Sequence, residues 1–152
     1  ASAGGGLGLA LACDARIATS QAKMAASYAG MGLSPDGGTT WLLPRLVTDQ
    51  VARRFFLENE IWSAQQAAEL GAIDAIVEEK ELINCAKQLA LRWSRWGQHS
   101  KESIKHLLDV QSTNDFETHL KHERTLIEAS GQTAAFKEGV SAFLEKREAK
   151  FD

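Results

Sequence analysis

The sequence predicts an α/β fold that ends in a long helical region. Residues 1–47 contain most of the glycine and very little charge, and short apolar runs within them alternate as strands do. From residue 48 onward, apolar side chains recur at helical spacing and capping residues separate the helices. The 152 residues, 44% of them hydrophobic, give room for one ordinary core and exclude a disordered polypeptide. We therefore divide the chain into an α/β part, residues 1–77, and a helical part, residues 78–152.

The first predicted helix follows a glycine turn. Gly4-Gly5-Gly6 directly precedes an apolar run, residues 7–12, that predicts a short helix buried on every side. A turn of this kind usually follows a strand, which we expect before Ala1. The chain also starts with alanine rather than methionine. We therefore expect it to be the C-terminal part of a longer protein, whose missing N-terminal segment is a partner of this one.

Two short strands and a loop are expected next. Alternating side chains predict strands over residues 16–19 and 23–26. Five glycines and prolines then predict a long irregular loop that ends at Gly38. A helix should begin at Thr39 and end near Pro44, because proline cannot donate the hydrogen bond that continues a helix.

The rest of the chain is predicted to be mostly helical. Thr48 can cap a helix that continues to Leu57. Ser63 has capping-box spacing for a helix that Gly71 stops. A brief apolar strand is expected over residues 75–77, and helical periodicity then predicts four helices, over residues 79–96, 100–111, 114–130 and 133–146.

Charge and cysteine content exclude several classes of protein. The net charge is −3, from 17 basic and 20 acidic residues, so no nucleic-acid partner is expected. No apolar stretch approaches the roughly 20 residues that cross a bilayer, so we expect no membrane partner. Two cysteines, Cys13 and Cys85, are too few for a disulfide scaffold and suit a reducing compartment. The expected location is the cytoplasm or, in a eukaryote, the mitochondrial matrix.

The glycine run is the first place that could carry chemistry. Glycines at Gly4–Gly6 allow close approach of a ligand to the backbone, and the free N–H groups at a helix start attract negative charge. The alternative is a tight turn that packs a helix on a sheet. A nucleotide-binding P-loop is disfavoured, because no Lys-Ser or Lys-Thr pair follows the glycines.

Asp36 is the second place in the sequence that could carry chemistry. It lies in Ser34-Pro35-Asp36-Gly37-Gly38, which is typical of a turn whose aspartate caps the following helix. Met31, Leu33 and Trp41 predict apolar surroundings, however, and no lysine or arginine lies within eight residues of Asp36. A carboxylate in such a place takes up a proton more readily than one in water, which would suit a general base. Both interpretations stay open at this point.

The third place that could carry chemistry is the pair His119 and His122, with Glu123 beside them. Spacing of three residues places both imidazoles on one helix face and could start a metal site. No further ligand cluster lies nearby in the sequence and the helix is polar, so we expect a solvated surface and no metal.

Several of these motifs together resemble a known family. The most specific block is Ala3–Ala18 (AGGGLGLALACDARIA); further blocks lie at 32–39, 42–46, 63–71, 136–139 and 143–147. The combination resembles the enoyl-CoA hydratase/isomerase (crotonase) superfamily over nearly the whole chain. The resemblance implies that residues 1–77 are the C-terminal part of a crotonase-like spiral of ββα units and that residues 78–152 are a helical trimerisation region. It implies a homotrimer or hexamer, and an acyl-CoA thioester as substrate with no resident cofactor.

The resemblance also assigns roles to individual residues. Members stabilise an enolate in an oxyanion hole, and the N–H of Gly5 would be one donor, with the second donor in the missing N-terminal segment. Hydratases of the family use two glutamates, whose positions are Gly8 and Tyr28 here. Asp36 matches the acidic catalytic residue of several isomerases and the nucleophile of dehalogenases. We therefore rank isomerase above dehalogenase and hydratase, with a non-catalytic CoA-binding or assembly homologue as another possibility and nucleotide binding at the glycine run as the weakest.

Substrate contacts are expected from five residues: Gly6, Tyr28, Leu33, Phe143 and Lys146. Phe143 and Lys146 lie one turn apart, so an aromatic face and an ammonium would project from one side of the last helix. In the family a similar pair covers the adenine and phosphate of CoA. A buried Phe143 with a solvated Lys146 is an equally open interpretation.

Overall fold

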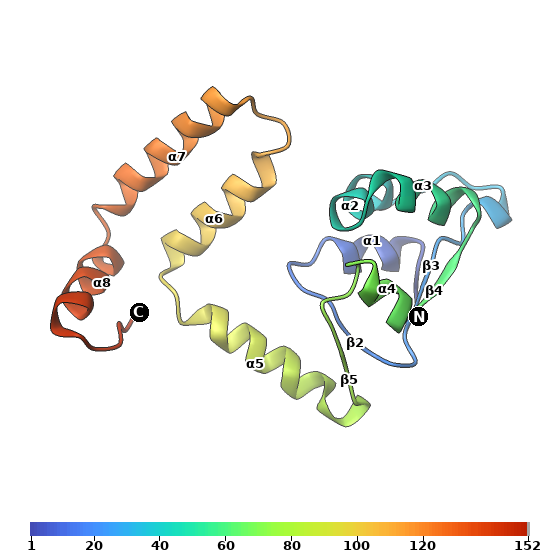
Figure 1. The fold of residues 1–152 in the computed structure, drawn as a ribbon, viewed down its shortest axis with the longest axis horizontal. Coiled ribbons are helices and arrows are strands. Elements are labelled where there is room, and N and C mark those ends of the chain that lie inside the picture. The colour runs from blue at the N-terminus through green and yellow to red at the C-terminus, as the bar shows by residue number, and fades with distance from the viewer. Residues whose placement is uncertain (152) are drawn as a thin grey trace. The chain divides into compact units, whose positions relative to one another are not determined.

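The computed structural model describes residues 1–151, and Figure 1 shows its elements. The chain divides into one compact unit over residues 1–87 and a second that begins at Gln88. The division between the two units falls inside a helix. It does not test the predicted domain boundary between residues 77 and 78, which stays a prediction.

Short strands and helices alternate in the first unit. In chain order they are β1 (Ser2–Ala3), α1 (Gly5–Leu11), β2 (Ile17–Thr19), β3 (Lys23–Ala25), the 3-10 helix η1 (Ala29–Met31), α2 (Thr39–Leu46), α3 (Asp49–Leu57), β4 (Ile61–Ser63), α4 (Ala64–Glu69), β5 (Ala75–Val77), the 3-10 helix η2 (Glu79–Glu81) and the start of α5 (Leu82–Ser94). The predicted strands and helices of this part are confirmed, apart from four corrections given below.

The strands form two small sheets. In the larger sheet β1 pairs with β3 in parallel, with Ala3 opposite Ala25, and β4 pairs with β3 in the antiparallel direction. In the smaller sheet β2 and β5 are parallel. Because parallel strands end at the same edge of a sheet, the residues that follow β1 and β3 emerge side by side. Those residues are the glycine turn and the segment that contains Tyr28.

Three sequence-based expectations about these elements were wrong, and one strand was missed. The strand expected before Ala1 lies within the chain, as β1. Helix α1 is not buried on every side, because Leu9 is 73% exposed. Helix α2 continues past Pro44 to Leu46, since proline removes only its own N–H bond and Val47 still donates to the carbonyl of Leu43. Strand β4 was not predicted.

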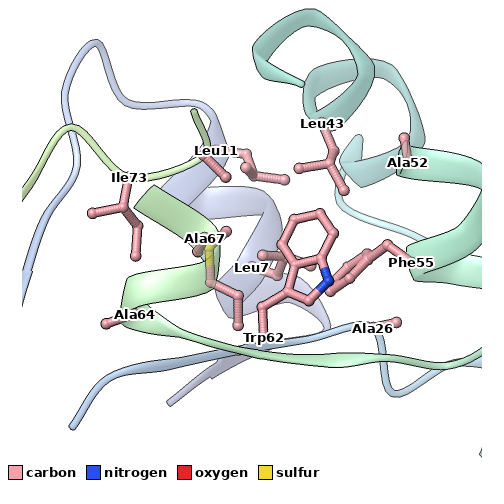
Figure 2. Close-up of a cluster of buried hydrophobic side chains, with 12 residues drawn as sticks. Leu7, Leu11, Ala26, Leu43, Ala52, Phe55, Trp62, Ala64, Ala67 and Ile73 are labelled. Carbon is pink, nitrogen blue, oxygen red and sulfur yellow. The ribbon is translucent and has the colours of Figure 1, made fainter. Parts of the chain in front are cut away.

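The core of this unit gathers side chains from four helices and two strands, β3 through Met24 and β4 through Trp62. Figure 2 shows them converging from α1, α2, α3, α4, β3 and β4 around Trp62 and Phe55. Trp62, Phe55, Leu7 and Leu43 are fully buried. The rings of Phe55 and Trp62 have centroids 4.2 Å apart. Helix α1 is therefore fixed against the larger sheet through Leu7, which holds the glycine turn in place.

The second unit consists of helices alone. They are the end of α5, α6 (Gln98–Val110), α7 (Phe116–Ser130) and α8 (Ala134–Glu145), and they confirm the predicted helices with shifts of a few residues. Helices α6 and α7 pack against each other. No residue of α5, α6 or α7 is buried. Within the described residues, no helix is long and apolar enough to cross a membrane.

Candidate active site

The glycine turn places exposed amide groups at the start of α1. Gly4 has a φ of 52°, a conformation that glycine adopts without strain, and its carbonyl accepts hydrogen bonds from the amides of Leu7 (3.0 Å) and Gly8 (3.3 Å). Gly5 and Gly6 form the exposed first turn, which contains no acidic residue. The first N–H groups of a helix have no partner within it, so those of Gly5 and Gly6 are able to bind a negatively charged oxygen.

The loop that carries Asp36 packs against this helix start. A Cβ on Gly37 would lie 3.5 Å from the Cα of Gly5 and 3.6 Å from the Cα of Gly8. A Cβ on Gly8 would overlap the carbonyl oxygen of Gly37. Asp36 precedes Gly37 directly, so the backbone of the predicted acid lies next to the helix start that contains the predicted amide donor.

Asp36 is held at two points. Its backbone carbonyl accepts hydrogen bonds from the amide (3.1 Å) and the hydroxyl (3.0 Å) of Thr39. Its Oδ1 accepts a hydrogen bond of 3.0 Å from the hydroxyl of Tyr28. The N-cap of α2 is Gly38, and no side chain caps that helix. The interpretation in which the Asp36 carboxylate caps α2 is therefore wrong, because only its backbone carbonyl contacts the helix start.

Within residues 1–151, Asp36 does not lie in the buried apolar surroundings that the sequence predicts. Asp36 is exposed. Met31, Leu33 and Trp41 are 72%, 57% and 58% exposed, so these side chains are open to solvent and do not form a buried apolar pocket. The guanidinium of Arg45 lies 3.6 Å from the centroid of the Trp41 ring and hydrogen-bonds the Trp41 carbonyl, which orients this indole beside the loop.

The remaining residues expected to contact substrate differ in their positions. Tyr28 is only 5% exposed, whereas Leu33 is exposed and Gly6 lies on the open first turn of α1. Phe143 is 83% exposed, on α8 in the second unit, so it is not a core residue. Lys146 lies one residue beyond α8 with a φ of 54°. Lys146 is thus the C-cap of α8, where the backbone leaves the helix. The expected arrangement of both side chains on one helix face stays a prediction.

The histidines on α7 contact other groups than the sequence suggested. His122 Nδ1 lies 3.4 Å from Nε2 of His106 on α6, and His119 Nε2 lies 3.6 Å from the Glu123 carboxylate. Through residue 151, no group of three or more histidine, cysteine, aspartate or glutamate side chains could hold a metal ion. The pairing of His106 with His122 joins two helices, so spacing on one helix could not predict it.

The contact that the sequence analysis missed most clearly is the one between Tyr28 and Asp36. These residues flank the irregular loop, at its start and near its end. A tyrosine directly after a strand and an aspartate near the following helix are compatible with such a contact, but nothing in the spacing requires it. The contact between Tyr28 and Asp36 depends on the way in which the loop folds back on α1.

Comparisons with known proteins agree with this architecture. The profile of a family described as enoyl-CoA hydratase/isomerase matches residues 1–152. The chain is 38% identical to the 1,2-epoxyphenylacetyl-CoA isomerase of Escherichia coli and 34% identical to the crotonyl-CoA hydratase of Syntrophomonas wolfei, over 98% and 97% of its length and 57% of either relative. The crystal structure of an enoyl-CoA hydratase from Polaromonas sp. JS666 is similar at a TM-score of 0.91 and 32% identity, over 99% of this chain and 59% of that one. The chain thus spans little more than half the length of the relatives it matches.

Proposed function

Because the chain belongs to the enoyl-CoA hydratase/isomerase family, a family of enzymes with the crotonase fold, we propose that the full-length protein shifts a carbon–carbon double bond in an acyl-CoA thioester. The single observation that carries this proposal is that Gly37, the residue directly after Asp36, packs against Gly5 at the start of α1. One acid and one oxyanion donor are the groups that such a shift needs.

In the proposed reaction Asp36 moves one proton. Its carboxylate removes a proton from carbon 2 of a 3-enoyl thioester, and the electron pair delocalises onto the thioester oxygen. The protonated Asp36 then returns the proton to carbon 4, which leaves the double bond between carbons 2 and 3. Atoms and charges balance without water, metal or a further reactant, because the same side chain acts first as base and then as acid.

The N–H of Gly5 would stabilise the enolate oxygen. This assignment is supported by the exposed first turn of α1 and by the absence of an acidic side chain from that turn. Losing one donor of an oxyanion hole typically costs about 2.7–4 kcal/mol of transition-state stabilisation. We propose that the second donor belongs to chain that precedes these residues in the full-length protein, since the relatives extend well beyond the matched part.

An isomerase is favoured over a hydratase by two residues. Gly8 and Tyr28 stand where the family resemblance places the two glutamates of hydratases, and neither offers a carboxylate. The contact between Gly8 and Gly37 also leaves no room for a side chain at position 8. A dehalogenase, in which Asp36 would attack carbon as a nucleophile, and a non-catalytic CoA-binding protein are the remaining alternatives, and no contact in the structure favours either.

The substrate is proposed to be a CoA thioester whose acyl part lies along exposed apolar side chains. Leu33 and Met31 border the loop that carries Asp36 and offer such a surface. Gly6 is proposed to contact the thioester, and Phe143 and Lys146 the nucleotide end of CoA. No resident cofactor is proposed, because the thioester itself makes the proton at carbon 2 acidic.

The helical unit is proposed to assemble copies of the chain, as a homotrimer or as a hexamer built from trimers. The proposal is supported by large apolar side chains that α6 and α7 leave exposed, among them Ile104, Leu108 and Ile127. We further propose that the larger sheet continues into a crotonase-type spiral of ββα units in the full-length protein, which is proposed to be cytoplasmic.

An exchange experiment tests the assignment of Asp36. The full-length protein is incubated in D₂O with trans-3-hexenoyl-CoA, and NMR follows deuterium at carbons 2 and 4 together with formation of the 2-enoyl thioester. We expect Asp36→Asn to lower both rates by at least a thousandfold, because an amide cannot accept the proton. Asp109→Asn, an exposed position on α6, is the matched control and should keep wild-type rates.

The alternatives predict other outcomes. Wild-type exchange in Asp36→Asn would remove Asp36 from the mechanism. Conversion of crotonyl-CoA to its 3-hydroxy product without any shift of the 3-enoyl bond would identify a hydratase. Binding of the thioester with neither exchange nor product in the wild type would identify a non-catalytic homologue.

A further inference from the structure

A buried phenol contacts the exposed carboxylate of the candidate site. The ring of Tyr28 packs against Phe56, with centroids 6.3 Å apart, and Tyr28 as a whole is 5% exposed. A buried tyrosine hydroxyl needs a hydrogen-bond partner, because leaving it without one costs free energy. The partner here is Oδ1 of Asp36, at 3.0 Å. A tyrosine anchored in the core is thus linked directly to a side chain at the surface.

Thr39 fixes the direction of that hydrogen bond. Its hydroxyl has a single proton, which it donates to the carbonyl of Asp36 at 3.0 Å, and it lies 3.5 Å from the hydroxyl of Tyr28. The Tyr28 hydroxyl lies 3.4 Å from the same Asp36 carbonyl but only 3.0 Å from the carboxylate. Because the Asp36 carbonyl already accepts the proton of the Thr39 hydroxyl, the Tyr28 hydroxyl donates its proton to Oδ1 of Asp36. Thr39 is fully buried, so this arrangement is held from the core side.

We propose that Tyr28 is a positioning residue for Asp36. Its hydroxyl holds Oδ1 and leaves Oδ2, which no described residue contacts through a hydrogen bond, to exchange protons with the substrate. Thr39 fixes the backbone of residue 36, and the contact of Gly37 with Gly5 fixes the loop against α1. The proposal rests on the proposed function, since it assumes that Asp36 moves the proton. In this proposal Tyr28 holds the carboxylate of Asp36 and does not contact the substrate.

The proposal predicts a change in turnover without a change in binding. In the full-length protein, Tyr28→Phe keeps the aromatic ring and removes only the hydroxyl. We expect kcat with trans-3-hexenoyl-CoA to fall at least tenfold, because the carboxylate then samples several orientations. We expect KM and the affinity for acetyl-CoA, measured by calorimetry, to change by less than twofold. In the Asp36→Asn background, Tyr28→Phe should have no further effect, since the group that it positions is already absent.

A packing control separates this role from a purely structural one. Phe56→Leu weakens the apolar contact with the ring of Tyr28 but keeps the phenol, so it should lower the thermal unfolding temperature while kcat stays within twofold of the wild type. Thermal unfolding of Tyr28→Phe shows whether that variant is folded. If Tyr28→Phe is not folded, 4-aminophenylalanine is incorporated at position 28 instead, because it retains a hydrogen-bond donor and should restore turnover. Tyr28→Trp and Tyr28→His are unsuited as replacements.

Two results overturn the proposal. Turnover of Tyr28→Phe within twofold of the wild type would exclude a positioning role, and a large loss of acetyl-CoA affinity would assign Tyr28 to substrate binding. Either result leaves the proposed function intact as long as Asp36→Asn is inactive. If Asp36→Asn keeps wild-type exchange, the proposed function itself fails, whatever the behaviour of Tyr28→Phe.

Discussion

A carboxylate at the surface of a protein normally samples several rotamers, and Asp36 does not have that freedom. Thr39 binds its backbone and Tyr28 binds one of its oxygens, and both of those residues belong to the buried part of the first unit. Fixing a catalytic group before the substrate arrives removes part of the entropy that a reaction must otherwise overcome. The residues beneath Asp36 are therefore as relevant to the proposed chemistry as the carboxylate itself.

Gly8 gives a second prediction at the scale of single residues. In Gly8→Ala the new methyl group would overlap the carbonyl oxygen of Gly37, and neither partner is a flexible side chain. The loop from Asp36 to Gly38 must then move away from α1. Overpacking of this kind typically costs about 1–3 kcal/mol. We expect urea unfolding to show that the free energy of unfolding falls by an amount in that range. The proposed isomerase activity of the full-length protein should also fall, because Asp36 moves with the loop.

A glycine elsewhere in the chain serves as the control for Gly8. In α8, a Cβ on Gly139 would meet only a ring carbon of Phe151, at 4.0 Å. Gly139→Ala should therefore stabilise that helix, by up to about 1 kcal/mol. Unchanged stability and activity in Gly8→Ala would show that the contact between the loop and α1 is unimportant.

The catalytic candidates could be named from the sequence, but their contacts could not. The glycine signature and the turn around Asp36 are local patterns, so Gly5 and Asp36 were predicted by residue number. The hydrogen bond from Tyr28 and the close approach of Gly37 to Gly8 depend on how the segment 26–38 folds back, which no periodicity encodes. The exposure of Leu33 was missed for the same reason, because the sequence does not show whether an apolar residue in a loop faces the core or the solvent.

Local signals also decided which elements could be predicted. The side chains of Thr48 and Ser63 accept hydrogen bonds from the amides of Val51 and Gln66, so both predicted caps are confirmed. Strand β4 was missed, although its three residues alternate, with buried Trp62 between two exposed neighbours. Its place is set by pairing with β3, a contact distant in sequence.

The end of the last helix is held by an ion pair that should respond to acid. The Glu138 carboxylate accepts two hydrogen bonds from the guanidinium of Arg147, at 2.6 and 3.0 Å, and one from the amide of Lys150, at 2.8 Å. These bonds favour the ionised form and lower the pKa of Glu138 from the usual 4.5 to about 2. Because the folded pKa is depressed, the stabilisation is complete above pH 4.5 and is lost as the pH falls toward 2.

NMR can follow that loss at the amide of Lys150. We expect its chemical shift to move between pH 4.5 and 2 in the wild type, as the carboxylate that it contacts takes up a proton. Glu138→Gln should remove this titration and loosen the segment after α8 already at neutral pH. Glu117→Gln, which breaks only a surface pair with Lys121, should leave it unchanged. Titration of the Lys150 amide in Glu138→Gln would assign the effect to another group.

At the scale of the whole molecule, the two units differ in how much apolar surface they bury. The first encloses an aromatic and aliphatic core around Trp62 and Phe55, as Figure 2 shows. In the second, α6 and α7 enclose a shallow hollow of about 600 Å³ whose apolar lining includes Ile104, Leu120 and Ile127. These three side chains are 57%, 44% and 70% exposed. Contiguous apolar surface of this kind usually marks an interaction site.

The last prediction concerns the occupant of that surface, which we propose to be another copy of the chain. A glutamate in place of Ile127 would carry an unpaired charge into the interface, and burying such a charge is far more costly than leaving it in water. In the full-length protein we therefore expect Ile127→Glu to shift sedimentation equilibrium from trimer or hexamer to monomer. Thr125→Glu adds the same charge to an exposed position of α7 that does not line the hollow, so it should leave the mass unchanged. A wild-type protein that sediments as a monomer, or an Ile127→Glu variant that stays trimeric, would place the contacts between copies elsewhere.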